Sequence, residues 1–381
     1  MKILYVISTP IEYSSSANMR NIALISGLIE NGHKVDLISD GYNTESKYID
    51  HNICKIKFNK RYYLRKITTS HNNTNHNSKI KEKVAKLISK ISIYDNRKIL
   101  VNNAKKIRLN ENYDIMISSS DPKSSHLIAK EILRNNRISI KKWVQYWGDP
   151  FANDINKKTI IPTKYIKREE RKILSLADKI VYVSPFTLKK QRDIYPKESS
   201  RMCFFPIPYL KEKIYQKNIT NQVTLGYFGD YSSKDRNIIP LYKSIEKTPN
   251  IKLIIYGNSN INLKETNNII IKDRQSTKNV EQAQEKCTIL VCICNKEGTQ
   301  IPGKIYHYSA TNKPILIILD GENSEEIKDY LKKFDRYEFC VNDEESIKSA
   351  IERISRSKFN PCPAKKLSCK KIAIDFINEM K

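Results

Sequence analysis

The chain has 381 residues, 39% of them hydrophobic, and a formal net charge of +27 at pH 7. This length predicts two domains, and the hydrophobic content excludes a disordered chain. The eight cysteines form no C-x-x-C pair and no zinc-type spacing, so we expect reduced thiols, with no metal and no cofactor. The first residues do not form a signal peptide, and no apolar run approaches the ~18 residues of a membrane-spanning helix.

The first half alternates strand and helix patterns. Apolar runs predict buried parallel strands at 2–8, 34–39, 113–118, 142–147 and 179–184. Apolar residues at spacings of three and four predict helices at about 17–31, 124–135 and 164–177. This alternation predicts a doubly wound α/β sheet with right-handed crossovers.

The segment 204–222 contains two prolines and loses periodicity, and we interpret residues 206–222 as an interdomain linker. The alternation then restarts, with strands predicted at 223–228, 252–257, 288–294 and 314–319. Helices are predicted at 236–247, from about 302, from 324 and near 344–355. The expected domains are 1–205 and 223–361, with a C-terminal helix at about 362–381 packing back on the first.

The stretch 55–108 carries 16 lysine or arginine residues against two acids, Glu82 and Asp95. Such a block requires a polyanionic partner or a solvated face. Within it, residues 79–91 combine apolar positions at helical spacing with interleaved lysines, which suits an anionic bilayer surface. The alternative is an amphipathic helix packed on its own domain. Nucleic-acid binding is a third hypothesis, but no helix-turn-helix, aromatic RNA-binding strand or zinc module supports it.

The segment GTQIPGKI, residues 298–305, resembles a Walker A loop without fitting one. Ile305 lacks the hydroxyl that would hold Mg²⁺, and Pro302 removes a backbone donor, so we exclude a P-loop triphosphatase. The alternative is a helix whose N-terminus, at Gly303 and Lys304, favours a diphosphate. His307 shares the face of Lys304 and could hydrogen-bond a ribose hydroxyl or a phosphate. An ordinary strand–loop–helix with a surface lysine explains the residues equally well.

In the first half, two strand ends carry polar residues. YWGDPF places Asp149 after a strand, where it could orient an acceptor hydroxyl, although Asp149-Pro150 could also be a simple turn. SSSDPKSSH contributes His126 and Asp121 at the next such position, and Asp121 could instead cap the following helix. We take Asp149 and His126 as the candidate catalytic residues.

The segment QIPGKIYHYSATNKPILII, 300–318, resembles the carboxyl-domain signature of family 4-type glycosyltransferases, which have the GT-B fold. MKILYVIS, NGHKVDLIS, EERKILSLADKIVYVSPF and VTLGYFGDYSSKDRNIIPLYKSI resemble other segments of that family. The resemblance is collinear over almost the whole chain. It implies two Rossmann-like domains facing a central cleft, with the acceptor in the amino-terminal domain and a nucleotide-sugar donor in the other.

The resemblance also implies site residues. Lys304 and Arg236 would bind the donor diphosphate, with Lys234 as a substitute for Arg236, and Gly229 would let the backbone approach the donor. The family commonly carries two glutamates separated by seven residues, where this chain has Thr299 and His307. Residues 273–277 would lie near the nucleotide base.

The function that the resemblance implies is a bacterial, retaining glycosyltransferase. It would move a sugar from a nucleotide-diphosphate donor to a lipid-linked cell-surface glycan precursor, such as lipopolysaccharide or capsule. We expect a cytoplasmic protein, peripheral on the inner membrane face through the basic region 55–108, without nucleic acid. The alternative is a catalytically lapsed relative that binds a glycan or serves as a scaffold.

Overall fold

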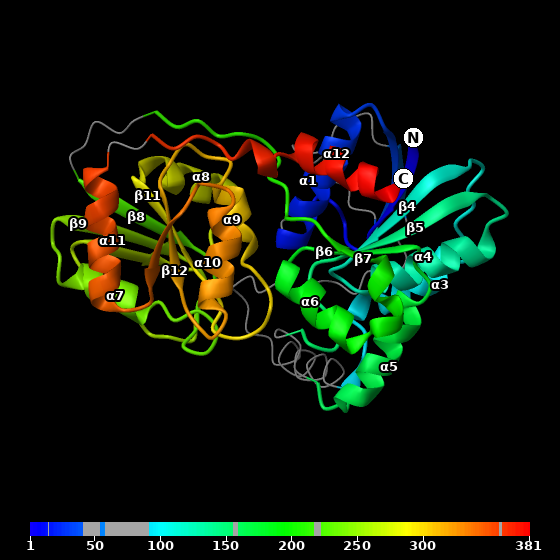
Figure 1. The fold of residues 1–381 in the computed structure, drawn as a ribbon, viewed down its shortest axis with the longest axis horizontal. Coiled ribbons are helices and arrows are strands. Elements are labelled where there is room, and N and C mark those ends of the chain that lie inside the picture. Colours follow the sequence, from blue (N-terminus) through cyan, green and yellow to red (C-terminus); the bar gives the residue numbers. More distant parts are fainter. Residues whose placement is uncertain (14, 41–53, 58–90, 155–158, 217–221, 358–359) are drawn as a thin grey trace, which may run out of the picture. The chain divides into compact units, whose positions relative to one another are not determined.

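The computed structural model describes residues 1–13, 15–40, 54–57, 91–154, 159–216, 222–357 and 360–381 (Figure 1). Two compact units are present: unit 1 is Met1–Phe205 with Ala373–Lys381, and unit 2 is Pro206–Ile372. Most of the basic region 55–108 lies outside the described residues, as does almost all of the helix predicted at 79–91. No helix in the described part of the chain is long and apolar enough to cross a membrane.

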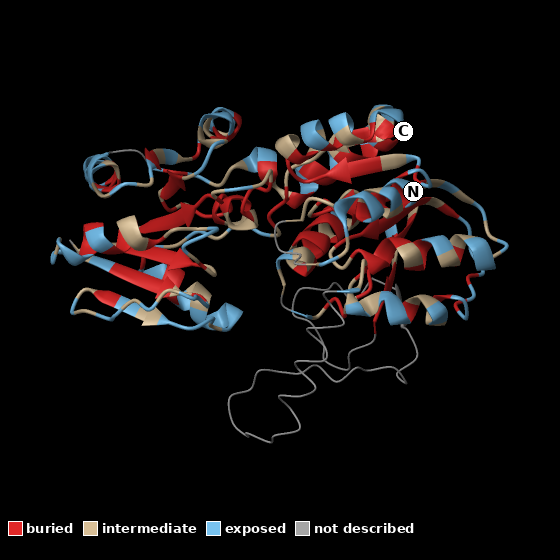
Figure 2. Ribbon diagram, turned by 90° about the horizontal axis from the view of Figure 1, so that it is seen from below, coloured by how far each residue is buried: buried red, intermediate tan, exposed pale blue. Residues whose placement is uncertain are grey.

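Unit 1 is built on a parallel sheet whose described strands run in the order β3-β2-β1-β4-β5-β6-β7. The strands are β1 (Lys2–Val6), β2 (Lys34–Ser39), β3 (Cys54–Lys57), β4 (Tyr113–Ser119), β5 (Ile140–Trp147), β6 (Lys179–Tyr182) and β7 (Met202–Phe204). The central strands are fully buried, because helices cover both faces of the sheet (Figure 2). This burial on both faces explains why their sequences are near-continuous apolar runs.

The helices of unit 1 connect these strands. They are α1 (Ser16–Glu30), α3 (Val101–Ala104), α4 (Ser124–Asn135), α5 (Thr163–Leu174), α6 (Pro185–Ile194) and the 3₁₀ helices η2 (Asn96–Leu100) and η3 (Pro196–Arg201). The C-terminal helix α12 (Cys369–Met380) places Phe376 against Tyr146 and Phe205, with ring centroids 5.9 and 5.3 Å away. The end of the chain is therefore part of the core of unit 1.

Unit 2 has a second parallel sheet, with described strands in the order β10-β9-β8-β11-β12-β13. The strands are β8 (Val223–Phe228), β9 (Ile251–Tyr256), β10 (Ile269–Lys272), β11 (Ile289–Ile293), β12 (Ile315–Leu319) and β13 (Glu338–Val341). The helices are α7 (Ile239–Glu246), α8 (Thr277–Lys286), α9 (Gly303–Tyr308), α10 (Ser324–Lys332), α11 (Glu344–Arg356) and the 3₁₀ helix η4 (Lys365–Leu367). The predicted doubly wound architecture is confirmed in both units.

Two segments differ from their predicted structure. The helix predicted at 236–247 begins only at Ile239, because Ser232 and Arg236 exchange backbone hydrogen bonds of 3.1 and 3.2 Å and close a tight turn. In the stretch 206–216, Tyr209 N donates to Leu367 O at 3.0 Å and Lys213 N donates to Ala310 O at 2.8 Å. These bonds attach the proline-containing stretch to unit 2.

The strand order decides where a ligand can approach each sheet. The order reverses between β1 and β4 in unit 1 and between β8 and β11 in unit 2. At such a switch point the loops after the two strands turn to opposite faces, which leaves a crevice outside their carboxyl ends. The loops that follow β8 and β11 carry the residues predicted to bind the donor.

Candidate functional site

The loops after β8 and β11 bring Gly229 and Lys304 together. A Cβ atom added to Gly229 would lie 3.5 Å from Lys304 Cε, an ordinary van der Waals distance. The glycine that the packing requires is Gly257, after β9, because a Cβ there would overlap the carbonyl of Gly229. The sequence predicts a role for Gly229 and none for Gly257, although the strand-end position of Gly257 is visible in KLIIYG.

Lys304 and Arg236 form a pair of cations without a described carboxylate partner. Arg236 Nε donates to Asn295 Oδ1 at 2.7 Å and Nη1 donates to Asp230 O at 3.4 Å, both neutral acceptors. No described residue forms a hydrogen bond or ion pair with the half-buried Lys304 ammonium. Burial, with the neighbouring Arg236 charge, lowers the pKa of Lys304 to about 8. An anion beside these two groups would relieve both the burial cost and the repulsion.

The carboxylate of Asp230 is occupied elsewhere. It pairs with Arg274, and its Oδ1 accepts a hydrogen bond from Asn258 N at 3.0 Å. Arg274 belongs to the 273–277 loop after β10, where we expect the nucleotide base. The ion pair therefore ties this loop to the loop after β8. No local sequence pattern marks Arg274 as a site residue, because its partner is 44 residues away along the chain.

Lys234 and Thr299 have different surroundings from the cation pair. Lys234 is exposed in the 232–236 turn, whereas Arg236 at the base of that turn contacts Asn295. Thr299 lies in the loop before α9, where its backbone N–H donates to Gln300 Oε1 at 3.2 Å. Arg236 is thus the better-placed cation of the turn, although it precedes α7 and does not open it.

His307 lies on α9, three residues after Lys304. Its Nε2 atom is buried and has no hydrogen-bond partner among the described residues. Burial, followed by the charges of Lys304 and Lys213, lowers the pKa of His307 to about 4, so the ring is neutral at pH 7. A neutral imidazole can donate or accept one hydrogen bond through this nitrogen. An unpaired buried nitrogen costs about 1–3 kcal/mol, which a ligand hydroxyl or phosphate oxygen would remove.

In unit 1, the loop after β5 presents Asp149. Glu170 holds this loop, because its carboxylate accepts from Phe151 N at 2.8 Å and from Ala152 N at 2.9 Å. No described residue forms a hydrogen bond or ion pair with the Asp149 carboxylate. Burial, followed by the negative charges of Asp121 and Asp154, raises the pKa of Asp149 to about 7. Asp149 is therefore able to exchange a proton near neutral pH.

The other acids of this cluster, Asp121 and Asp154, both pair with one buried lysine. Lys123 Nζ lies 2.7 Å from both Asp121 Oδ1 and Asp154 Oδ2. Burial alone would lower the pKa of Lys123, but these carboxylates outweigh it and raise the pKa well above the usual lysine range. Burial alone would raise the pKa of Asp121, yet the Lys123 ammonium holds it below its usual value. Asp149 is left as the acid without an ion-pair partner in this described cluster.

Arg20 on α1 is a member of this cluster that sequence analysis misses. It is 5% exposed, donates from Nη2 to Ser120 O, and stacks 5.0 Å above the Tyr146 ring. Its Nη1 occupies the space that a side chain at Gly148 would need. Its Nε is buried without a partner among the described residues. The guanidinium therefore supports the loop carrying Asp149 and keeps a positive charge beside it.

His126, the second predicted catalytic residue, lies inside the core of unit 1. It is 0% exposed, and its Nδ1 shares a hydrogen bond of 2.8 Å with Ser118 Oγ. Its ring stacks on Trp147 with centroids 4.2 Å apart. Burial lowers the pKa of His126 to about 3, so it is neutral at pH 7. In this position the imidazole can support Trp147 but has no surface on which to meet a substrate.

Solved structures share this two-unit architecture. Sucrose-phosphate synthase from Thermosynechococcus elongatus matches with a TM-score of 0.59 and 11% identity, over 100% of this chain and 98% of that one. HepE of Anabaena, in complex with UDP and glucose, matches with a TM-score of 0.60 and 10% identity, over 100% and 99%. A glycosyltransferase from Rickettsia africae matches with a TM-score of 0.50 and 14% identity, over 99% and 97%.

These matches establish the fold, because structures this similar over their whole length share an architecture at any sequence identity. The chain has the GT-B fold, with two Rossmann-like units, as the sequence predicts. No profile of a known protein family matches the sequence, and no curated protein sequence matches it. Membership of family 4 itself stays a prediction.

Proposed function

We propose that the protein is a glycosyltransferase that takes a sugar from a nucleotide-diphosphate donor bound to unit 2 and transfers it to an acceptor bound to unit 1. The observation that carries this proposal is the pair Lys304 and Arg236, two neighbouring cations without a described carboxylate partner. A structure with the same fold, HepE, contains UDP and glucose, which supports a nucleotide-sugar donor.

The cation pair fits the chemistry of a departing diphosphate. Negative charge grows on the leaving oxygen as the sugar–oxygen bond breaks, and fixed positive charges that meet it lower the barrier. Lys304 and Arg236 supply those charges at the switch point of the sheet. Gly229 and Gly303 leave backbone within reach of the donor, and Thr299 lies in the loop before α9. His307 donates or accepts one hydrogen bond, at a donor hydroxyl or a phosphate oxygen.

Asp149 is the residue we assign to the acceptor. With its pKa near 7, it can orient the attacking hydroxyl and accept its proton during transfer. Arg20 contacts the loop at Gly148, before Asp149, and Glu170 holds it after Asp149 through the N–H groups of Phe151 and Ala152. His126 acts as a positioning residue through Trp147.

We extend the proposal to retention of anomeric configuration and to a lipid-linked precursor of a bacterial cell-surface glycan such as lipopolysaccharide or capsule. The basic region 55–108 supports a peripheral position on the cytoplasmic face of the inner membrane, since each exposed lysine near an anionic surface adds about 1 kcal/mol. Vesicles with and without anionic lipid, at low salt, test this position. Equal sedimentation with neutral vesicles would contradict it.

A second candidate is a GT-B protein that binds a donor or glycan without transferring sugar. Thr299 and His307 favour it, because they occupy the positions where the resembling family carries its two glutamates. The distinguishing measurement is turnover: nucleotide release from a bound donor, with and without acceptor, separates an enzyme from a binding protein.

A thermal-shift panel of UDP, GDP, ADP and CMP tests donor binding. We expect one nucleotide to stabilise the wild type saturably, and Lys304→Ala to need about 10–100-fold more nucleotide for the same stabilisation. Lys234→Ala is the matched control, because Lys234 is exposed in the turn and should leave the shift unchanged. If no nucleotide stabilises the protein but single-stranded nucleic acid does at moderate salt, the proposal is wrong.

A further inference from the structure

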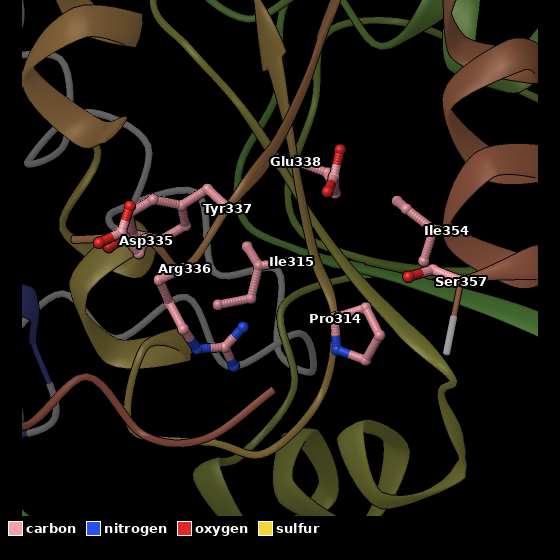
Figure 3. Close-up of a pocket in the computed structure, with 8 residues that line it drawn as sticks. All are labelled: Pro314, Ile315, Asp335, Arg336, Tyr337, Glu338, Ile354 and Ser357. Atoms are coloured by element: carbon pink, nitrogen blue, oxygen red, sulfur yellow. The ribbon is translucent and has the colours of Figure 1, made fainter. Parts of the chain in front are cut away.

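Unit 2 contains a cavity at the edge of its sheet opposite the carboxyl ends of the strands. It has a volume of about 160 Å³ and lies where β12 and β13 begin, near Pro314, Ile315 and Glu338, and beside the C-terminal end of α11, at Ile354 and Ser357 (Figure 3). The donor residues follow the carboxyl ends of β8 and β11 instead. The cavity is thus separate from the proposed donor site.

Arg336 is a charged side chain at the cavity, and two of its nitrogen atoms have no hydrogen-bond partner among the described residues. It is 5% exposed and lines the cavity. Its Nη2 donates to Thr311 O and Lys313 O, both at 2.7 Å, while Nε and Nη1 are buried and have no partner among the described residues. No described carboxylate forms an ion pair with it. Burial lowers the pKa of Arg336 to about 10, so it stays charged at pH 7.

The acids that line the cavity do not neutralise this charge. In Figure 3 the guanidinium of Arg336 extends toward Ile315 and Pro314, whereas the carboxylates of Asp335 and Glu338 point away from it. Both acidic residues are exposed and can be solvated by water. The buried guanidinium therefore keeps two unused donor groups and an uncompensated charge, a state that is costly unless a ligand supplies an acceptor.

We propose that this cavity binds a phosphate group, either as free phosphate or as part of a small phosphate ester, with Arg336 as its charged partner. The volume of about 160 Å³ suffices, since a water molecule in the liquid takes about 30 Å³. A phosphate oxygen accepts charge-assisted hydrogen bonds from a guanidinium. Ser357 also lines a neighbouring hollow together with Arg353, Arg356 and Glu352, and Glu352 pairs with Arg356 at 3.7 Å.

The cavity wall is bonded to the segment that follows α9. Arg336 holds the carbonyls of Thr311 and Lys313, and the hydroxyl of Tyr337 shares a hydrogen bond of 2.6 Å with Ser309 Oγ. Helix α9 carries Lys304 and His307. A ligand that orders Arg336 should therefore also order the end of α9, and linkage then requires phosphate and donor to alter each other's affinity.

The test measures thermal stability in inorganic phosphate and, separately, in glucose 1-phosphate, at constant ionic strength and without nucleotide. We expect a saturable rise in Tm in the wild type and in Lys304→Ala, whose donor site is impaired. Ser357→Trp should block the cavity mouth and abolish the rise. Ser355→Trp is the matched control, because Ser355 is exposed on the same helix and does not line the cavity.

The possible results test the phosphate site at the Arg336 cavity separately from the proposed glycosyl transfer. Stabilisation by inorganic phosphate, by the ester, or by both supports the cavity site, and the tighter ligand identifies its source. A rise that disappears in Lys304→Ala but survives in Ser357→Trp would mean that phosphate binds at the donor site, and no rise with either probe would also overturn the proposal. Arg336→Lys, which retains a charge, should weaken phosphate binding at least severalfold.

Discussion

Unit 1 and unit 2 both reverse their strand order beside their first strand, which is β1 in unit 1 and β8 in unit 2. The side chains near these switch points, however, carry opposite charges in the two units. In unit 1 the described acid without an ion pair is Asp149, beside two carboxylates that share Lys123 as their partner. In unit 2 the excess charges are Lys304 and Arg236, beside an Asp230 that Arg274 already neutralises.

The comparison explains why two pKa values move in opposite directions toward neutrality. Burial disfavours the charged form of either group, which raises the pKa of an acid and lowers that of a base. Like charges nearby reinforce this, so Asp149 reaches about 7 and Lys304 about 8. Asp149 and Lys304 are therefore both able to change their charge near physiological pH.

The largest expected effect is that of Asp149→Asn on activity. If Asp149 takes the acceptor proton, kcat should fall by about 10²–10⁴-fold, whereas donor affinity in unit 2 should stay unchanged. Steady-state kinetics and nucleotide titration measure the two quantities. Asp193→Asn, an exposed change on α6, is the control. A kcat within threefold of wild type would remove Asp149 from the chemistry.

The same substitution should raise stability, with a defined pH dependence. The folded-state pKa of Asp149 is near 7, above the value of about 3.9 in an unfolded chain. The folded protein then holds a proton that the unfolded chain releases, so stability falls as pH rises from about 4 to 7. Asparagine removes this loss, and its gain in Tm should be larger at pH 8 than at pH 5.

Lys304→Ala should weaken nucleotide-diphosphate binding by about 10–100-fold, the loss of a charged hydrogen bond worth roughly 1.5–3 kcal/mol. Stability should not fall, because the substitution removes a cation without a described partner. Wild-type affinity should also decline as the pH rises through about 8, where half of the free ammonium has lost its proton. Calorimetric titration from pH 6 to 9 measures both effects. An equal loss in Lys234→Ala would indicate diffuse electrostatics instead of a defined site.

Gly257→Ala tests whether the backbone approach at Gly229 shapes the donor site. The added methyl overlaps the Gly229 carbonyl, and overpacking of this kind costs about 1–3 kcal/mol. Nucleotide affinity should fall as well, because the displaced loop contacts Lys304. Gly32→Ala in unit 1 is a matched control: it meets no neighbouring atom, but its φ of 78° strains alanine. It should cost stability alone, as denaturant unfolding and titration can verify.

The smallest expected effect is that of Arg20→Gln, with a loss of activity of severalfold at pH 7. The Arg20 charge lowers the pKa of Asp149, so its removal should move the acidic limb of the pH–rate profile to higher pH. A purely structural role would lower the rate without moving this limb. Arg20→Lys, which keeps the charge, should restore the position of the limb even if the rate stays reduced.

The local sequence by itself determined the alternation of buried strands and helices, and with it the two doubly wound sheets. It also determined which residues stand at strand ends, such as Asp149 after β5 and Gly303 with Lys304 at the start of α9. These features depend on apolar spacing over a few residues, which a single sequence displays directly.

Only the tertiary structure decided which charges meet. Arg20 and Ser120 are 100 residues apart, and Asp230 and Arg274 are 44 apart, so strand order and not spacing brings them together. The same holds for Gly257 beneath Gly229 and for the start of α7, which the Ser232–Arg236 turn delays. Charge pairing and backbone contact are non-local. The shifted pKa values of Asp149 and Lys304 therefore follow only from the folded structure and not from the local sequence.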